Sequence, residues 1–328
     1  GFIFLLNVVA VKLFAEFEFW FSLIKVAAII GLILLGGYMI TTHFITPEGN
    51  VSSLGQIWNH GNIFPRGLSG FFSGFQLAIF SFVGLELAGI AAAEVKNPEQ
   101  NLPKAINAIP IRVIIFYILA LAVIMAVTPW NEVSPDSSPF VRMFTLIGMP
   151  AAAGIVNFIV LTAGASAANS GLFSTSRMTY RLAKQQAAPA VFAKLAAHKV
   201  PVNAIIFSCL SMVAVYTSIG TIPSIMSAFT LITAVSAILF IFVWSFILFS
   251  YMSYRLNHKA LHENSHYKMP GGVAMCIIVL LFFAFTLGLM AVNPETFVAF
   301  IASVLWCAAL VAFYFIWVEP LNRSRNQL

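Results

Sequence analysis

The feature that most limits the fold of this chain is a series of long apolar runs. Stretches of about 20 residues with few or no charges recur from one end of the sequence to the other. A helix of that length covers the roughly 30 Å of hydrocarbon in a bilayer. Because 60% of the residues are hydrophobic and only 9% are charged, a water-soluble domain would be unable to bury the apolar surface. We therefore expect an all-α, polytopic membrane protein.

The apolar runs, and the polar, Gly and Pro residues that separate them, predict eight complete membrane spans. Their ranges are residues 16–42, 67–93, 104–129, 149–182, 200–219, 224–255, 272–292 and 296–318. The opening GFIFLLNVVAV, residues 1–11, reads as the end of a further span, and the chain begins with Gly1. We treat residues 1–328 as a single transmembrane domain and expect more helices before it.

The positive charges orient these spans, because Lys and Arg in short loops are retained on the cytoplasmic side. With the C-terminus inside, all of the 17 Lys and Arg residues except Arg66, Arg142 and Lys25 fall on that side. We expect a multi-pass protein of the plasma (inner) membrane with a cytoplasmic C-terminus. The net charge of +6 is then an orientation signal, and its dispersal over several loops argues against a nucleic-acid partner.

Two ionisable residues, Lys25 and Glu86, lie inside predicted spans. Such residues are costly in hydrocarbon and often mark a substrate or ion pathway. Lys25 lies roughly 13 Å into its span by helical rise, near the limit at which a lysine can reach the interface along its own stem. Snorkelling or structural pairing is therefore an alternative for Lys25. The same alternative is weaker for Glu86, whose short side chain lies far from both ends of its span.

A glycine just before Glu86 indicates an interrupted helix. The segment FSFVGLELAG, residues 80–89, places Gly84 two positions before the glutamate in the middle of an apolar run. Non-helical backbone at membrane depth is tolerated only where it lines a cavity or contacts protein. Two half-helices ending in a cavity direct carbonyl groups and amide groups into it, which suit a cation and an anion respectively. A zwitterion uses both, so the segment predicts an amino-acid site.

Seven phrases resemble, in order and spacing, the amino acid transporter family of the amino acid, polyamine and organocation superfamily. They are FSFVGLEL, AAAEVKNPEQNLPKAINAIPIR, VTPW, SPFV, LTAGASAANSGLFSTSRM, LAKQQAAP and VPVNAI. Within the family, KAINAIPIR, PAAA, SAANSGLFSTSRM and YKMP most resemble permeases of D-serine, D-alanine and glycine. Aromatic and basic amino acid permeases, or a general one, are the alternative, although they depart more in the ANSG segment. The resemblance implies two inverted five-helix repeats plus two helices, alternating access, and helices five to twelve in this chain.

The resemblance also implies a set of substrate-binding residues. They are Phe80, Ser81, Phe82, Val83, Gly84, Glu86, Asn169, Ser170, Gly171, Thr233 and Ser236. Phe80 would be an aromatic gate, the carbonyl groups up to Leu85 would receive the ammonium, and Glu86 would brace the break or bind protons. For the small polar residues of the other two helices, close helix packing or bonding back to the helix is an equal alternative. The pocket opposite Phe80 would admit only glycine, alanine and serine.

The coupling ion is implied by the same resemblance. Proton-coupled members of the family place a lysine of the fifth helix where sodium-coupled relatives bind Na⁺, and Lys25 stands at that position. An ammonium in a site of low dielectric releases its proton more readily. We therefore expect proton symport with Lys25 as the principal coupling group and Glu86 as the second choice. The expected partners are the amino acid, protons and the bilayer, and no cofactor is expected beyond the proton gradient.

Other classes of protein have less support. An enzyme would need a nucleophile with a base, or a metal cluster, and no His, Cys or Asp lies inside a span with a plausible partner. His258, His262 and His266 recur every four residues, but we expect a solvated linker there and no metal. An amino-acid-permeable channel would also explain a broken helix with an acid at its centre, although a closed central site suits a single interrupted span better.

Overall fold

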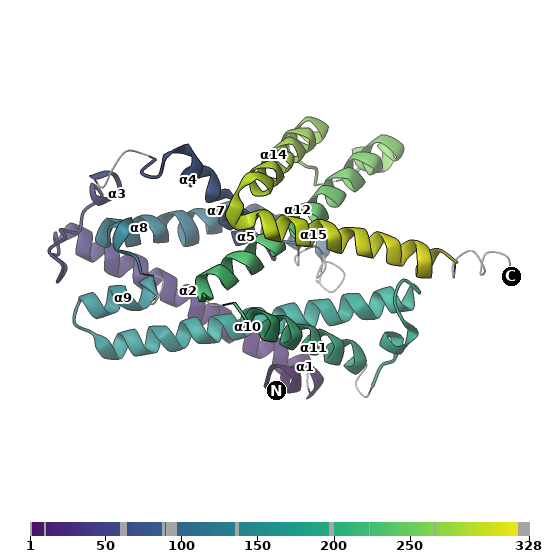
Figure 1. Ribbon diagram of the computed structural model, residues 1–328, viewed down its shortest axis with the longest axis horizontal. Coiled ribbons are helices and arrows are strands. Elements are labelled where there is room, and N and C mark those ends of the chain that lie inside the picture. The colour runs from purple at the N-terminus through teal and green to yellow at the C-terminus, as the bar shows by residue number, and fades with distance from the viewer. Residues whose placement is uncertain are drawn as a thin grey trace. The chain divides into compact units, whose positions relative to one another are not determined.

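The fold is known from a computed structural model, in which helices make up nearly all of the ordered elements (Figure 1). The structure describes residues 2–9, 11–59, 64–86, 89, 97–134, 138–196, 200–222, 224–265 and 267–320. Among these residues there is no strand, and the one β-bridge joins Ile45 to Val51. The prediction of an all-helical, polytopic membrane protein is confirmed.

Among the residues that the structure describes, six helical segments are long and apolar enough to cross a membrane. Four of them are single helices: α10 (Pro150–Lys184), α12 (Ile225–Asn257), α14 (Gly272–Val292) and α2 (Val11–Thr41). A fifth combines α7 (Pro98–Val113), a π-helical turn (Ile114–Leu119) and α8 (Ala120–Val127), and the sixth continues α15 (Pro294–Phe313) into a π turn (Tyr314–Val318). The shorter helices are α1 (Phe2–Val9), α3 (Gln56–Asn59), α4 (Gly67–Ser73), α5 (Phe75–Ser81), α9 (Pro139–Leu146), α11 (Val202–Ile219) and α13 (Lys259–Glu263).

The predicted spans differ in detail from the helices, and two of them show how. The span predicted to start at residue 104 begins at Pro98, which occupies the first helical position, where the missing N–H of a proline costs no hydrogen bond. In the predicted span 67–93, α4 and α5 are followed by turn residues that reach Glu86. Residues 87, 88 and 90–93 of that prediction lie outside the described part of the chain.

The helices divide into two compact units, one of residues 1–63, 110–220 and 314–328 and the other of residues 64–109 and 221–313. In the first unit, α2 packs against α8 and α10, and α10 also contacts α1, α9 and α11. Its largest buried cluster consists of Leu32, Met39, Ala120, Val123, Ile124, Val127 and Met143. Gly36 lies against the side chain of Val123, so α2 and α8 approach closely where α2 lacks a side chain.

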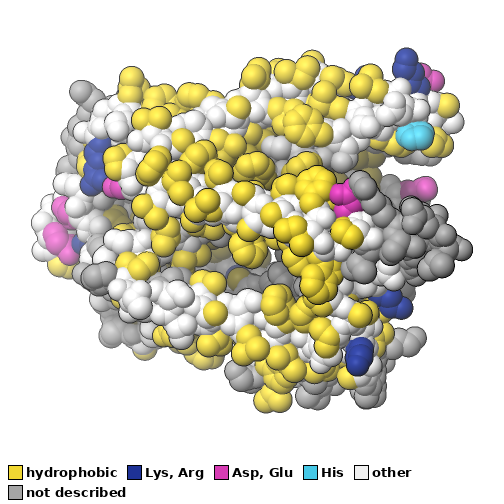
Figure 2. Space-filling view, turned by 45° about the vertical axis from the view of Figure 1, so that its right-hand side comes forward, with side chains coloured by type: hydrophobic (Ala, Val, Ile, Leu, Met, Phe, Trp, Pro, Cys, Tyr) yellow, Lys and Arg dark blue, Asp and Glu magenta, His cyan; other side chains and the backbone are white. Residues whose placement is uncertain are grey.

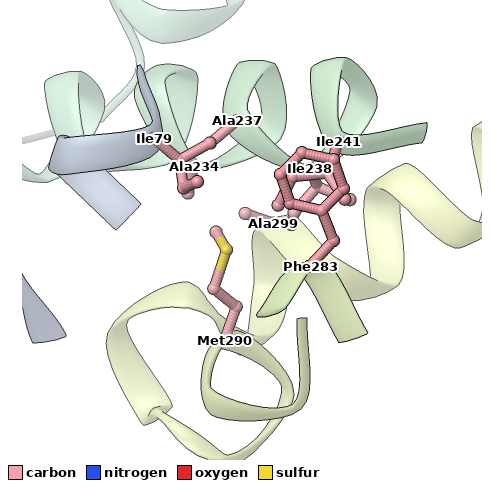
Figure 3. Close-up of a cluster of buried hydrophobic side chains, with 8 residues drawn as sticks. All are labelled: Ile79, Ala234, Ala237, Ile238, Ile241, Phe283, Met290 and Ala299. Atoms are coloured by element: carbon pink, nitrogen blue, oxygen red, sulfur yellow. The ribbon is translucent and has the colours of Figure 1, made fainter. Parts of the chain in front are cut away.

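In the second unit, α12 is the central helix and contacts α5, α14 and α15. Figure 3 shows the buried cluster between them, in which Ile79 comes from α5 and Phe283 and Met290 from α14. The remaining members are Ala234, Ala237, Ile238, Ile241 and Ala299. Since three of these are alanine, the backbones of α12 and α15 can lie near each other, as is usual for helices packed in a membrane.

Large hydrophobic side chains are also abundant on the outside. Figure 2 shows them over most of the visible face, with few charged groups among them. Phe158, Leu161, Phe246 and Leu281 are examples that are at least 63% exposed. Apolar surface of this extent is unfavourable in water and suits contact with lipid.

The prediction that residues 258–266 form a solvated linker is partly wrong. His258 is exposed, but His262 on α13 is buried, with its ring edge-on to those of Tyr251 and Tyr254 at 5.9 and 6.3 Å. The two tyrosine rings pack against it, a contact that periodicity alone did not indicate. His266 lies outside the described residues, and no cluster of metal-binding side chains occurs among the residues that the structure describes.

Candidate functional site

The helix that carries the segment 80–89 is interrupted, as its glycine predicted. After α5 ends at Ser81, the amides of Phe82 and Val83 donate to carbonyl groups three residues earlier, at 3.1 and 3.0 Å. Gly84 then has a φ of +106°, a conformation that side-chain-bearing residues rarely adopt. We call Phe82–Glu86 the open turn.

The carboxylate of Glu86 closes this turn. Its two oxygens accept hydrogen bonds from the backbone amide of Gly84, at 3.0 and 3.2 Å. The indole N–H of Trp244, on α12, donates to one of the same oxygens at 3.2 Å. The glutamate therefore braces the break, and through Trp244 it connects the open turn to α12.

A cavity of about 740 Å³ lies beside the open turn, within the second unit. Its wall consists of Phe75, Ala78, Ile79, Phe82, Leu85, Glu86, Ile106, Trp244, Ile247, Leu248, Val279, Phe282 and Phe283. Glu86 is the one charged side chain in this set. Because the remaining wall is apolar, hydrogen bonds to the carboxylate are worth more there than in water, and a missing one costs more.

Three other predicted residues of this unit, Thr233, Phe80 and Ser81, have structural partners. Thr233 is 2% exposed, and its hydroxyl accepts a 2.6 Å hydrogen bond from Gln76 on α5 while donating to the carbonyl of Phe229. Phe80 is half-buried and packs against the cluster of Figure 3. Ser236, three residues after Thr233 on α12, is half-buried. Ser81 donates to the carbonyl of Ala78 at 2.7 Å.

In the first unit, Lys25 is held by α10. Its ammonium donates to the hydroxyl of Ser166 at 2.8 Å, and Ser166 is only 1% exposed. Lys25 itself is half-buried on α2. The lysine therefore points toward a neighbouring helix and its hydroxyl, and this contact is the structural pairing that the sequence left open as an alternative for Lys25.

Asn169, one turn after Ser166, also has a polar partner. The side-chain amide of Asn7 on α1 donates to its oxygen at 2.7 Å, and both residues are buried. Ser170 is half-buried and Gly171 is exposed. A Cβ atom added to Gly171 would meet no atom within 4 Å, so this part of α10 is open within its unit.

The predicted site residues thus belong to two units, and each group is coherent by itself. Phe80 to Glu86 and Thr233 lie in one unit, and Lys25 with Asn169 to Gly171 in the other. The site also contains three residues that were not predicted from the sequence, Asn7, Gln76 and Trp244. Asn7 and Gln76 carried a signal, since each is an uncharged polar residue inside an apolar run. Trp244 carried none, because it stands among other aromatic residues.

This chain belongs to the amino acid permease family, which matches residues 1–325. It is a multi-pass membrane protein.

Particular members are similar along most of the chain. A D-serine/D-alanine/glycine transporter of Escherichia coli (strain K12) is 52% identical over 305 residues, which is 93% of this chain and 65% of the relative. The amino-acid permease AapA of Bacillus subtilis (strain 168) is 43% identical over 94% of this chain and 66% of its own length. The DL-alanine permease SerP2 of Lactococcus lactis is 40% identical over 95% of this chain and 67% of its own length. The chain thus spans about two thirds of the length of these relatives.

Proposed function

We propose that the natural protein containing this chain is a secondary transporter that carries glycine, D-alanine and D-serine into the cell across the plasma membrane. The observation that carries the proposal is the open turn, where the helix is broken at Gly84 and the backbone carbonyl groups of the break lie next to a braced carboxylate. Such carbonyl groups suit the ammonium of an amino acid, and small substrates agree with what the relatives are named for.

We further propose that protons drive the uptake and that alternating access carries the substrate through. The support is the contact between Lys25 and Ser166, which places an ammonium on a buried hydroxyl between two helices. In this proposal the ammonium is the group that takes up and releases the coupling proton as the site opens to either side. Lys25 is the principal coupling group in this proposal, and Glu86 is the second choice because it already braces the turn.

The test is uptake of labelled glycine by cells that express the natural protein, with and without a protonophore. Competition with D-alanine, D-serine, L-serine, lysine and phenylalanine identifies the substrate class. We expect D-alanine and D-serine to compete strongly and the protonophore to abolish accumulation. Competition by lysine or phenylalanine without any by D-serine would assign the chain to a general or aromatic and basic permease. Conductance that does not saturate would indicate a channel.

Substitution of Gly171 tests the size limit of the pocket. Gly171→Leu is tolerated sterically within its unit, so its effect reports on transport more than on folding. If Gly171 faces the substrate, leucine should exclude D-alanine and D-serine more than glycine, at a cost of roughly 1 to 3 kcal/mol for an added side chain. Gly154→Leu, on the same helix and equally open, is the matched control. Equal inhibition of all three substrates would remove Gly171 from the pocket.

A further inference from the structure

The hydrogen bond between Trp244 and Glu86 joins two segments that are distant in the sequence. The glutamate ends the open turn, whereas the tryptophan lies near the middle of α12. Gly84 and Trp244 donate to the same carboxylate from different directions, one from the turn itself and one from the neighbouring helix. The amide of Gly84 belongs to the open turn itself, so it cannot fix the carboxylate relative to the rest of the unit. The indole of Trp244, on α12, can do so.

The indole is itself held in place. Its ring is 6.0 Å from that of Phe240, one turn earlier on α12, and 6.0 Å from that of Phe283 on α14. Trp244 also packs against the buried cluster shown in Figure 3. Since aromatic rings flank it on two elements, the direction of its N–H is determined by packing in the core of this unit.

The apolar surroundings of Glu86 increase the stabilisation that it gains from the indole N–H of Trp244. The cavity beside the open turn is apolar apart from Glu86, so a carboxylate that lost the indole would find no other side-chain donor among the lining residues described. Hydrogen bonds to charged groups are stronger than those between neutral groups, and buried ones are costly to lose. The position of Glu86, and with it the shape of the open turn, therefore depends on Trp244.

We infer that Trp244 is a positioning residue for substrate recognition. It holds Glu86 from the rigid side, Glu86 holds the amide of Gly84, and the carbonyl groups of the open turn are thereby kept in the arrangement that receives an ammonium. Trp244 touches no substrate in this scheme and acts through Glu86. The inference rests on the proposed function, since it assigns the open turn to the ammonium of the amino acid.

The first experiment replaces the indole in the natural protein. Trp244→Phe keeps an aromatic ring in the core but removes the N–H donor. We expect the KM for glycine and D-alanine to rise by about fivefold or more, as befits loss of a hydrogen bond to a charged group, with Vmax per transporter much less affected. Trp306→Phe, on α15 at a position that is 57% exposed, is the matched control and should leave both constants unchanged. An unchanged KM in Trp244→Phe overturns the inference.

The second experiment asks whether Trp244 acts through Glu86. Glu86→Ala removes the acceptor, so Trp244→Phe should then add nothing further, and the effects of the two changes on KM should be far from additive. Glu86→Gln, which keeps an acceptor oxygen, should retain the sensitivity to Trp244→Phe. Additive effects would show that Trp244 acts elsewhere and would overturn the inference.

A third readout separates this inference from the proposed function. The same double-mutant cycle is measured as the thermal unfolding temperature of the purified protein in detergent without any substrate. Non-additive shifts of the unfolding temperature would show that Trp244 and Glu86 are coupled, even if the protein transports none of the small amino acids. In that case only the proposed function fails. Additive thermal shifts together with normal uptake by the unmodified protein would overturn the inference alone.

Discussion

Several polar side chains of this chain form a hydrogen bond with a polar side chain of another helix. Lys25 with Ser166, Asn7 with Asn169 and Gln76 with Thr233 are all pairs of this kind. In an apolar interior an unpaired polar group costs free energy, so each pair both joins two helices and limits what either member can do for a ligand. The effect of substituting such a residue therefore depends on its partner as well.

Replacement of Lys25 should separate coupling from recognition. We expect Lys25→Gln to abolish accumulation driven by a pH gradient, because the ionisable group is lost, while exchange of substrate across the membrane continues. Uptake and exchange are measured with the natural protein in liposomes. Lys259→Gln, at an exposed position on α13, is the control and should behave like the unmodified protein. Normal gradient-driven uptake by Lys25→Gln would transfer the coupling role to Glu86.

Glu48, in the loop after α2, should make stability depend on pH. A hydrogen bond from its own backbone amide lowers the pKa of Glu48 below the ordinary 4.5, with help from Thr46 and from Arg142 at 3.2 Å. A lowered folded-state pKa stabilises the fold above the ordinary value, and this contribution disappears as the pH falls through the folded-state pKa.

The unfolding temperature of Glu48→Gln should accordingly be slightly lower than that of the unmodified protein at pH 6, and the difference should vanish in acid. The effect is expected to be small because the side chain is 44% exposed. Glu263→Gln on α13 serves as the control. A difference that grows toward low pH would contradict the prediction.

At the scale of the elements, the helices are held together where one of them lacks a side chain. α2 and α8 approach each other at Gly36, against which the side chain of Val123 lies. In the second unit, α12 and α15 carry alanine, whose side chain is a single methyl group, in the cluster of Figure 3. Close approach gains dispersion contacts, which matter in lipid because burial of apolar surface there provides little driving force.

Gly36→Ala should therefore destabilise the protein, whereas Gly37→Ala should not. The added methyl group at Gly36 would collide with Val123, at a cost of about 1 to 3 kcal/mol. At Gly37 nothing lies within 4 Å, so alanine should be neutral or stabilise the helix by up to about 1 kcal/mol. The measurement is thermal unfolding in detergent for both variants, and equal unfolding temperatures would refute the close approach.

At the scale of the whole molecule, the distribution of Lys and Arg predicts which loops face the cytoplasm. We expect Pro47, in the loop after α2, to lie outside and Lys259, on α13, to lie inside. Both side chains are exposed. The test uses Pro47→Cys and Lys259→Cys in a background where Cys209, Cys276 and Cys307 are replaced by alanine.

An impermeant thiol reagent applied to intact cells should label cysteine at position 47 and should label position 259 only after the membrane is opened. The three native cysteines are free thiols on membrane helices, which is why they are removed first. The reverse labelling pattern would invert the topology and place the C-terminus outside.

The sequence by itself determined the class of the protein, most of its helices and the location of the break. Those properties depend on local patterns, since the length of an apolar run matches the bilayer and a glycine beside an acid weakens one helix at one place. The tertiary structure alone decided which side chains meet. Trp244 is hydrogen-bonded to Glu86, Lys25 to Ser166 and Gln76 to Thr233 because separate helices pack in one particular register. That register follows from steric fit over whole helix faces, such as Gly36 against Val123, and no short stretch of sequence contains it.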